Sequence, residues 1–357
     1  MKKLTQMTDR MKEKYAELFL TALNTMEASN WEKPWVSANN GIPCNLYRKN
    51  QPYKGVNHFL LKLLCSISGF ETPYFVTFNE MNDEERKFGG LTLNTHFVLD
   101  ANGLPTFDKQ GMPVLQRESS FPVWKFLPRI KDKDGNLISQ YDYEQMTEEE
   151  QQECRTFFNL RTYYVWNIDQ TDFKTLYPED YAAMILPPEH EYKQTTIDPV
   201  LERMIMQPGE WRCPIEFGGH SACYLPSKDL VKLPQRDKFF SDEAFYGTAL
   251  HEMAHSTARE LKRSQDGTFG TEAYAMEEFI VELTAACVCS MLGVGKLLDQ
   301  EHLSYVDSWR KAIKTDTDFI PKVIDHVQRA TNYILRRYEA IADKMQGPKM
   351  LTAAAAA

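Results

Sequence analysis

The stretch YGTALHEMAHSTARELKR, residues 246–263, places two histidines four residues apart on either side of a glutamate. It has no glycine or proline after Gly247, and its apolar residues recur every three or four positions, so it predicts a helix. His251 and His255 then lie on one face and present two imidazoles to one point. Glu252 lies one position round, within reach of a water on a bound cation. This HExxH pattern indicates a zinc site of the hydrolytic type.

A third protein ligand must come from another segment. A metzincin-like helix would continue to a glycine and a third histidine, but Ala258 and Arg259 follow here. The next predicted helix, residues 271–292, carries Glu278 and Glu282 on one face of an otherwise apolar segment. Because an unpaired buried carboxylate is costly, we expect Glu278 to bind the metal. Glu282 would accept a hydrogen bond from the second nitrogen of a ligand histidine.

Two alternatives remain open for this acidic helix. Glu277 is a competing third ligand, although we expect it to face outward. The three glutamates could instead form salt bridges with Arg259 or Lys262. With Glu278 as ligand, the pattern is the gluzincin arrangement, HExxH followed by a distant glutamate.

A peptidase also needs a group that stabilises the oxyanion opposite the metal. Tyr224 is our first choice, because the strand-like HSACYLP precedes the HExxH helix and an edge strand commonly lines a peptidase cleft. His220 and Tyr246 are the alternatives. A tyrosine in such a strand more often packs in the core with its hydroxyl bonded.

The segment pattern predicts an α+β protein of two domains, as suits 357 residues. In the first half, helical segments at 8–28 and 57–67 precede the strand-like runs YFVTF, THFVL, FPVWKF and TYYVWNI. In the second half, a helix near 197–206 precedes the short runs PIEFG, ACYL and LVKLP and helices at 242–263, 271–292 and 318–342. We place the domains at 1–172 and 193–345, with a linker at 173–192. We find no internal repeat of fixed period.

Several classes of protein are not expected. No run approaches 18 apolar residues, so a membrane span is not predicted. The first residues lack the apolar segment of a signal peptide. Seven scattered cysteines, an odd number without a CxxC pair, favour the reducing cytoplasm over a disulfide framework.

The first 70 residues are locally basic in a chain of net charge −9, with ten lysines and arginines against five acidic residues. Aromatic residues are interleaved with these bases. Stacking aromatics in a positive groove are how proteins hold single-stranded nucleic acid, although tryptophans beside prolines are more often core residues. The candidate DNA-binding residues are Trp31, Lys33, Trp35, Arg48, Lys49, Tyr53 and Lys54.

The chain resembles ArdC-type antirestriction proteins and the polyvalent proteins of plasmids and phages over nearly its full length. The second half does so through ACYLPSKDLVKLP, FYGTALHEMAHST, FGTEAYAMEEFIVELTAA, YVDSWRKAI and ATNYI, and the first half through WEKPW, PCNLYRKNQPYKGVN, VTFNEM, FPVWKF and YYVWNIDQT. The resemblance implies a single-stranded DNA-binding N-terminal domain and a zincin-like metallopeptidase domain. It carries over His251, Glu252 and His255, and also Glu278 and Glu282. Ala258–Arg259 departs from the Gly–His often found in relatives.

Three hypotheses follow. The first is a zinc metallopeptidase joined to a single-stranded DNA-binding module, which protects the incoming DNA of a mobile element during conjugation or phage entry and acts on an unknown protein substrate. The second is a DNA-masking protein whose zincin domain is structural. The third, a metal-dependent nuclease, fits less well, because nucleases gather several carboxylates for hard cations.

Overall fold

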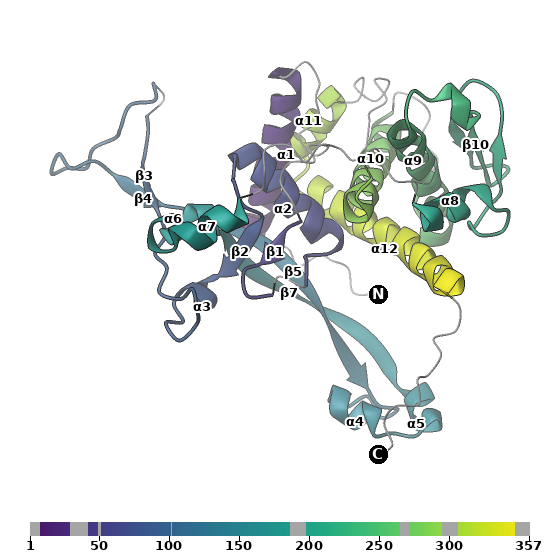
Figure 1. Cartoon of the computed structure of the whole chain (residues 1–357), viewed down its shortest axis with the longest axis horizontal. Coiled ribbons are helices and arrows are strands. Elements are labelled where there is room, and N and C mark those ends of the chain that lie inside the picture. Colours follow the sequence, from purple (N-terminus) through teal and green to yellow (C-terminus); the bar gives the residue numbers. More distant parts are fainter. Residues whose placement is uncertain are drawn as a thin grey trace. The chain divides into compact units, whose positions relative to one another are not determined.

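The computed structural model describes residues 8–28, 42–48, 51–100, 102–185, 198–264, 271–294 and 306–346. Helices and short sheets make up these residues (Figure 1), which confirms the predicted α+β class. The chain divides into two compact bodies: residues 5–73 with 183–357 form the helical body, and residues 74–182 form the sheet body. No helix among the described residues is long and apolar enough to span a bilayer.

The helical body combines N-terminal and C-terminal helices with one small sheet. Its helices are α1 (Asp9–Ala28), α2 (Gly55–Ser68), α8 (Pro199–Met206), α9 (Asp242–Leu261), α10 (Glu272–Leu292), α11 (Val306–Thr315) and α12 (Phe319–Gln346), with the 3-10 turn η3 (Arg236–Lys238). Its strands are β1 (Cys44–Asn45), β8 (Ile215–Phe217), β9 (Cys223–Leu225) and β10 (Leu230–Leu233). The six helices predicted in these regions are all present, with ends shifted by a few residues.

Helices α9, α10 and α12 lie side by side in Figure 1 and enclose much of the apolar core of the helical body. Helix α10 packs against α9 on one side and against α2 and α12 on others. Burial on several sides explains why its sequence is apolar nearly all round. The buried core side chains include Phe245, Leu250, Met253, Val281, Ala285, Val288, Ile334 and Ile341.

The ends of α9 and α10 are fixed by local backbone chemistry. The Ser241 hydroxyl accepts a hydrogen bond from the Ala244 N–H at the start of α9. Lys262 ends α9 in the left-handed conformation, with φ 53°, and Arg263 N–H then donates back to Ala258 O at 2.9 Å. This left-handed step returns the chain toward its own helix, which brings Arg263 into the interior.

The N-terminal helices α1 and α2 belong to the helical body. Phe19 of α1 meets Phe279 of α10 edge-on, with ring centroids 5.7 Å apart. Helix α2 begins at Gly55, where φ is +59° and an added Cβ would lie 2.5 Å from the Gln328 amide of α12. The same Gln328 accepts a hydrogen bond from Val56 N–H at 3.0 Å. The positive φ of residue 55 favours glycine at this start of α2.

His58 and Lys62 of α2 both reach Ser290 of α10. His58 Nε2 lies 2.9 Å from Ser290 Oγ, and Lys62 Nζ donates to the same oxygen at 3.2 Å. Burial lowers the pKa of His58 to about 4, and the Lys62 ammonium acts in the same direction. His58 is therefore neutral in the folded protein at neutral pH.

The small sheet lies beside α9. Its order is β8–β10–β9, with β10 parallel to β8 and antiparallel to β9. Strand β9 pairs along only one of its edges within this order, and it packs on α9. The predicted runs PIEFG, ACYL and LVKLP are these three strands.

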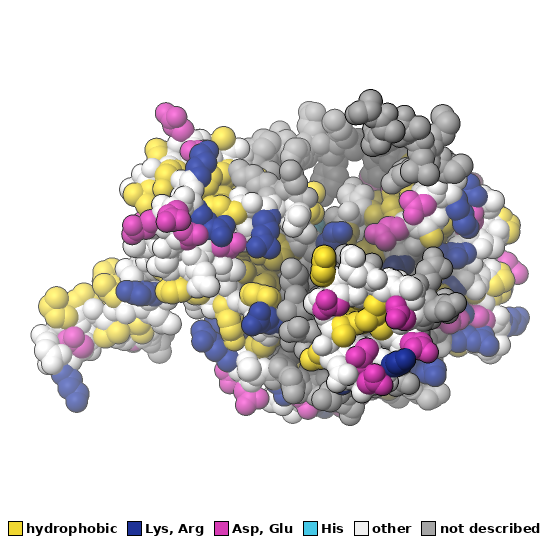
Figure 2. All heavy atoms as spheres, turned by 90° about the horizontal axis from the view of Figure 1, so that it is seen from below, with side chains coloured by type: hydrophobic (Ala, Val, Ile, Leu, Met, Phe, Trp, Pro, Cys, Tyr) yellow, Lys and Arg dark blue, Asp and Glu magenta, His cyan; other side chains and the backbone are white. Residues whose placement is uncertain are grey.

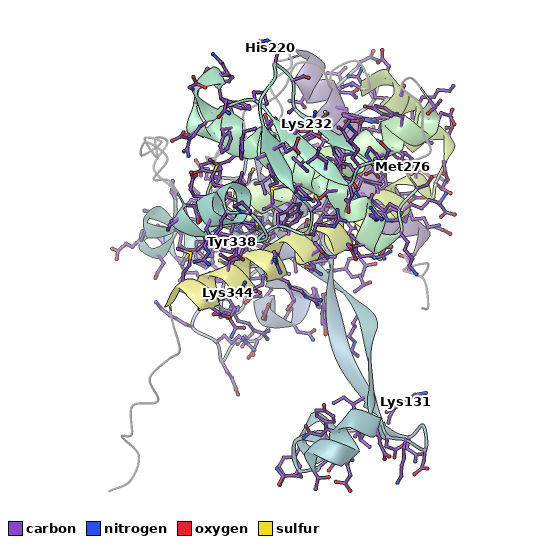
Figure 3. The ribbon with its side chains drawn as sticks, turned by 90° about the vertical axis from the view of Figure 1, so that its right-hand side faces the viewer. Lys131, His220, Lys232, Met276, Tyr338 and Lys344 are labelled. Carbon is purple, nitrogen blue, oxygen red and sulfur yellow. The ribbon has the colours of Figure 1, made fainter. Side chains whose placement is uncertain are left out.

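The long helix α12 holds α8 and the chain that follows it. Figure 3 shows Tyr338 and Lys344 on α12. Tyr338 Oη donates to the Asp198 carboxylate at 2.7 Å, and Asp198 caps α8. Lys344 Nζ donates to Glu210 at 3.1 Å.

The sheet body is built around one long antiparallel ribbon. Its strands are β2 (Tyr74–Thr77), β3 (Thr95–Phe97), β4 (Leu115–Arg117), β5 (Phe121–Lys131), β6 (Leu137–Ile138) and β7 (Arg155–Asn167). Its helices are α3 (Phe78–Met81), α4 (Gln140–Glu144), α5 (Glu148–Glu153), α6 (Phe173–Leu176) and α7 (Pro178–Met184), with η2 (Ile168–Gln170). Strands β5 and β7 pair from Phe121↔Val165 to Lys131↔Arg155, with β2 and β6 on their outer edges. The four strand-like runs predicted here all form strands.

A two-stranded arm, residues 95–117, contains a tandem repeat that our sequence analysis missed. Residues 98–105 and 106–113 each place an aspartate, then a left-handed glycine, then a proline at the same spacing. Asp100 and Asp108 accept the same pair of backbone hydrogen bonds in their repeats. The prediction that the chain has no repeat was therefore wrong. The arm, at the left of Figure 2, exposes six large hydrophobic residues: Phe97, Leu99, Leu104, Phe107, Met112 and Leu115.

The compact bodies divide the chain differently from the domains that we placed at 1–172 and 193–345. Residues 5–73 cluster with residues 183–357 in one compact body. Our domain boundaries concern sequence segments, and they stay a prediction.

The buried histidine of α2 makes the stability of the fold depend on pH. Its pKa is about 4 when folded and near 6.5 when unfolded, so the unfolded chain takes up a proton that the folded chain refuses. Between pH 7 and pH 5 this group should lower the free energy of unfolding by about 2 kcal/mol. Urea unfolding followed by tryptophan fluorescence at both pH values, in wild type and His58→Gln, measures this loss. An equal loss in the two proteins would contradict the assignment.

Candidate metal centre

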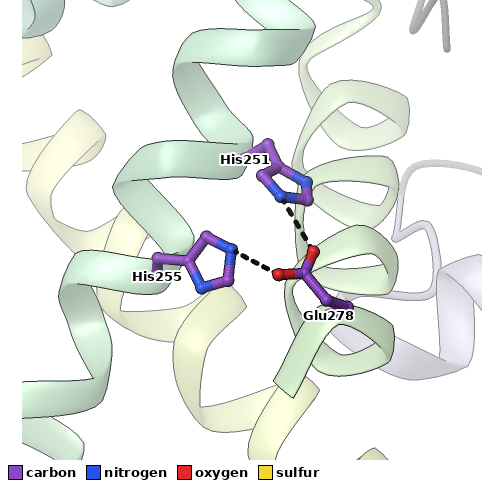
Figure 4. Close-up of side chains that lie close together, drawn as sticks. All are labelled: His251, His255 and Glu278. Carbon is purple, nitrogen blue, oxygen red and sulfur yellow. Dashed lines mark ion pairs between the residues drawn. The ribbon is translucent and has the colours of Figure 1, made fainter. Parts of the chain in front are cut away.

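The two histidines of the HExxH helix face a carboxylate on the neighbouring helix. His251 and His255 project from successive turns of α9, with ring centroids 4.9 Å apart. Glu278 projects toward both from α10 (Figure 4). His251 and Glu278 are 5% and 3% exposed, so the group is sheltered from bulk water.

The distances in this group suit a metal ion. His251 Nε2 lies 3.5 Å from Glu278 Oε2, and His255 Nε2 lies 3.5 Å from Glu278 Oε1. Two ligands of one tetrahedral zinc ion stand about 3.4 Å apart. One ligand atom from each of the three residues lies within 4.8 Å of the others. His251, His255 and Glu278 therefore fit a divalent cation between them.

The other ring nitrogens of the two histidines also face carboxylates. His251 Nδ1 lies 3.6 Å from Glu282 Oε2, and His255 Nδ1 lies 3.5 Å from Glu277 Oε1. Glu282 therefore lies beside the Nδ1 atom of His251, and its role as a hydrogen-bond acceptor stays a prediction. The expectation that Glu277 faces outward was wrong, because Glu277 is only 9% exposed and pairs with Arg263.

The electrostatics of the cluster favour an added positive charge. Three buried carboxylates, Glu277, Glu278 and Glu282, stand beside one guanidinium. Burial opposes ionisation of Glu278, yet His251 and His255 hold its pKa at about 2. Burial likewise opposes protonation of His251, but Glu278 and Glu282 raise its pKa to about 9. A divalent cation held here would supply a positive charge to these carboxylates.

Glu252 lies on α9 beside the candidate ligands. It is 8% exposed and makes no hydrogen bond or ion pair with any residue that the structure describes. Helix α9, which carries Glu252, packs on strand β9.

Of the three candidates for the group that stabilises the oxyanion, Tyr224 and Tyr246 are hydrogen-bonded to carboxylates, and His220 lies on an exposed loop. Tyr224 Oη donates to Asp229 Oδ1 at 2.8 Å, and burial together with this bond raises its pKa to about 12. Tyr246 is fully buried and donates to Glu202 at 2.7 Å. His220 is exposed on the loop between β8 and β9, at the edge of the view in Figure 3. The catalytic role of Tyr224 stays a prediction, and its proton is committed to Asp229 here.

Four of the candidate DNA-binding residues, Trp31, Lys33, Trp35 and Lys49, lie outside the described residues. Arg48 and Lys54 are exposed, and Tyr53 between them is half-buried. These three lie in the helical body, directly before α2. The segment therefore has two exposed cations, Arg48 and Lys54, and one half-buried aromatic residue between them in the sequence.

Sequence reasoning missed two arginines that surround the site. Arg263 and Arg212 bind Glu277 and Asp229 respectively, each through two nitrogens. Arg263 is the last residue of the predicted HExxH helix, where a basic residue is ordinarily solvated. The only signal in the sequence was Glu277 itself, because a carboxylate that is buried requires a cation beside it.

Two family models match the chain in sequence order. The model described as the N-terminal domain of anti-restriction factor ArdC matches residues 9–166, and the model described as a zincin-like metallopeptidase matches residues 201–324.

Known proteins are similar to the chain over most of its length. The uncharacterized protein y4eC of Sinorhizobium fredii is 32% identical over 311 residues, which is 86% of each protein. DNA primase TraC of Escherichia coli is 26% identical over 332 residues, 90% of this chain but only 27% of TraC.

Solved structures share the fold. Crystal structures of the antirestriction ArdC protein from the R388 plasmid, one metal-free and one Mn(II)-bound, are each 22% identical and match with a TM-score of 0.54. Each match covers 90% of this chain and 97% of that protein. The two family models and the full-length relative together show that this chain belongs to the ArdC family of antirestriction proteins, with an ArdC N-terminal domain followed by a zincin-like metallopeptidase domain.

Proposed function

We propose that this protein is a metal-dependent peptidase that acts during the antirestriction defence of incoming DNA. His251, His255 and Glu278 would hold a divalent cation, and Glu252 would serve as the general base. The observation that supports this most is the meeting of two Nε2 atoms with the two oxygens of one buried glutamate.

The chain's own residues divide the work of peptide hydrolysis. A divalent cation held here would acidify a water and polarise a substrate carbonyl. Glu252 would accept the proton of that water at its carboxylate and later donate it to the leaving amine. The low exposure of His251 and Glu278 excludes bulk water and strengthens each charge interaction. Strand β9, with one edge not paired in its sheet, would place an extended peptide beside Glu252.

We propose zinc as the ion, because two imidazoles and one carboxylate form a common catalytic zinc set. Manganese is the alternative, since the R388 plasmid ArdC protein has a structure described as Mn(II)-bound. Two imidazoles and one carboxylate also suit an ion, such as manganese, that takes six ligands.

We further propose that the N-terminal segment binds single-stranded DNA. Arg48 and Lys54 are exposed and flank Tyr53 in the sequence, and they are a local pair of cations in a chain whose net charge is −9. Membership of an antirestriction family supports DNA as the partner. The second candidate function, masking of DNA without proteolysis, rests on these residues alone. A protein that only masks DNA would not need Glu252.

Replacing Glu252 should separate metal binding from hydrolysis. Glu252→Gln removes the base but none of the three ligands, so metal content should be unchanged and cleavage of labelled casein should fall at least about 100-fold. Glu243→Gln, on the same helix, is the matched control and should cleave normally. Equal cleavage by wild type and Glu252→Gln would refute the assignment of the base. Labelled single-stranded DNA in the same tubes tests for nuclease activity.

Removing the shared carboxylate should remove the metal. Wild type at a zinc concentration about 100 times the dissociation constant should gain about 2.7 kcal/mol of stability. Glu278→Gln should lose most of that gain. Thermal unfolding with zinc, with manganese and with neither ion measures it. A gain of equal size in both proteins would show that the ion binds elsewhere.

Removing the two exposed cations should weaken DNA binding and its salt dependence. Arg48→Ala with Lys54→Ala should reduce the slope of log affinity against log salt by about 1.4, which corresponds to two phosphate contacts on a single strand. Fluorescence anisotropy of a labelled oligonucleotide at several salt concentrations gives this slope. Lys228→Ala with Lys238→Ala, two exposed lysines of the same body, is the control. An unchanged slope in the first pair would exclude this surface.

A further inference from the structure

Glu277 occupies a place that neither the ligand set nor a surface salt bridge explains. It is adjacent to Glu278 on α10, so the two side chains leave the helix about 100° apart. Glu278 faces Nε2 of both histidines, whereas Glu277 faces Nδ1 of His255 at 3.5 Å. Glu277 therefore lies on the far side of the His255 ring from the candidate ion.

Arg263 fixes the Glu277 carboxylate in that position. Its side chain is 2% exposed. Nε donates to Glu277 Oε2 at 3.1 Å, and Nη2 donates to Oε1 at 2.8 Å. A buried carboxylate with a planar two-point partner has little freedom to move.

The Arg263 guanidinium also donates hydrogen bonds to the turn of α9 that carries His255. Nη1 donates to Thr257 Oγ1 at 2.8 Å, and Nη2 donates to the Ala254 carbonyl at 2.9 Å. Ala254 and Thr257 flank His255 on α9. Arg263 therefore ties the base of the His255 side chain and the acceptor of its ring to one rigid group.

We propose that Glu277, clamped by Arg263, is the positioning residue of His255. The Glu277 carboxylate accepts the Nδ1 proton of His255, which fixes the tautomer and leaves the Nε2 lone pair directed at the ion. Arg263 holds the Glu277 carboxylate in place through two hydrogen bonds. This inference rests on the proposed metal site, since it assigns an orienting partner to one of its ligands.

The inference differs from a merely structural ion pair between α9 and α10. A structural pair would stabilise the helices and leave the ligand geometry unaffected. A positioning pair also sets how tightly the ion is held and how its ligands surround it. Cobalt(II) distinguishes the two, because its visible absorption reports coordination geometry independently of catalysis.

The test compares full-length variants for cobalt and zinc affinity and for the cobalt spectrum. Glu277→Leu should bind both ions about 10- to 100-fold more weakly and change the cobalt band. Glu277→Gln keeps a neutral acceptor for Nδ1–H, so its loss should be smaller. Glu272→Gln, an exposed position on the same helix, is the control and should match wild type.

A double variant distinguishes the loss of metal binding from the loss of the folded structure. Arg263→Met with Glu277→Leu removes both buried charges, so urea unfolding of the metal-free protein should remain cooperative. Its metal affinity should still be about 10- to 100-fold below wild type. Wild-type affinity and spectrum in Glu277→Leu or in the double variant would overturn the inference. If wild type itself binds neither ion, the proposed metal site fails instead.

Discussion

The arrangement of this protein depends on the burial of charge between α9 and α10. Three carboxylates enter an apolar interface, which is tolerated only when cations or hydrogen bonds meet each of them. Arg263 forms an ion pair with Glu277, and the ring nitrogens of the two histidines face the carboxylates of Glu278 and Glu282. The histidine ring nitrogens are thereby divided, with Nε2 of both rings on one side of the cluster and Nδ1 on the outer side. The positive charge that the inner side favours is the physical reason for placing a cation there.

The packing of the N-terminal helices changes how the two family segments relate to one another. The segment that matches the ArdC N-terminal domain, residues 9–166, is divided between the two compact bodies. Helices α1 and α2 pack on α10 and α12, and α10 carries Glu278. Arg48 and Lys54 thus share one compact body with the metal centre. A single-stranded polyanion at these residues and a peptide at β9 would bind to the same folded unit.

Local sequence patterns predicted the parts of the site that depend on local structure. The spacing of His251 and His255, and of Glu278 and Glu282, follows from the period of a helix, and both pairs stand on the faces that we expected. The placement of Glu277 depends on Arg263, which arrives through a left-handed lysine, Lys262. A lysine with positive φ has no sequence signal, because any L-residue other than glycine rarely adopts it.

Other side-chain contacts also escaped prediction, because no local pattern in the sequence indicates them. The docking of α2 on α12 rests on Gly55 and Gln328, which are far apart in the sequence. Tyr224 donates to Asp229, and Arg212 joins them from a preceding loop.

The tandem turns of the arm at residues 95–117 were visible in the sequence, but eight-residue units are shorter than the periods for which repeats are ordinarily sought.

The proposed divalent cation lies between α9 and α10. Crystals of the protein grown with zinc, and measured on both sides of the zinc absorption edge, would locate it. We predict one anomalous difference peak within bonding distance of His251 Nε2, His255 Nε2 and a Glu278 oxygen, with Glu282 and Glu277 against the outer nitrogens. A fully ordered cluster without such a peak, or a peak held by other residues, would exclude a cation at this position.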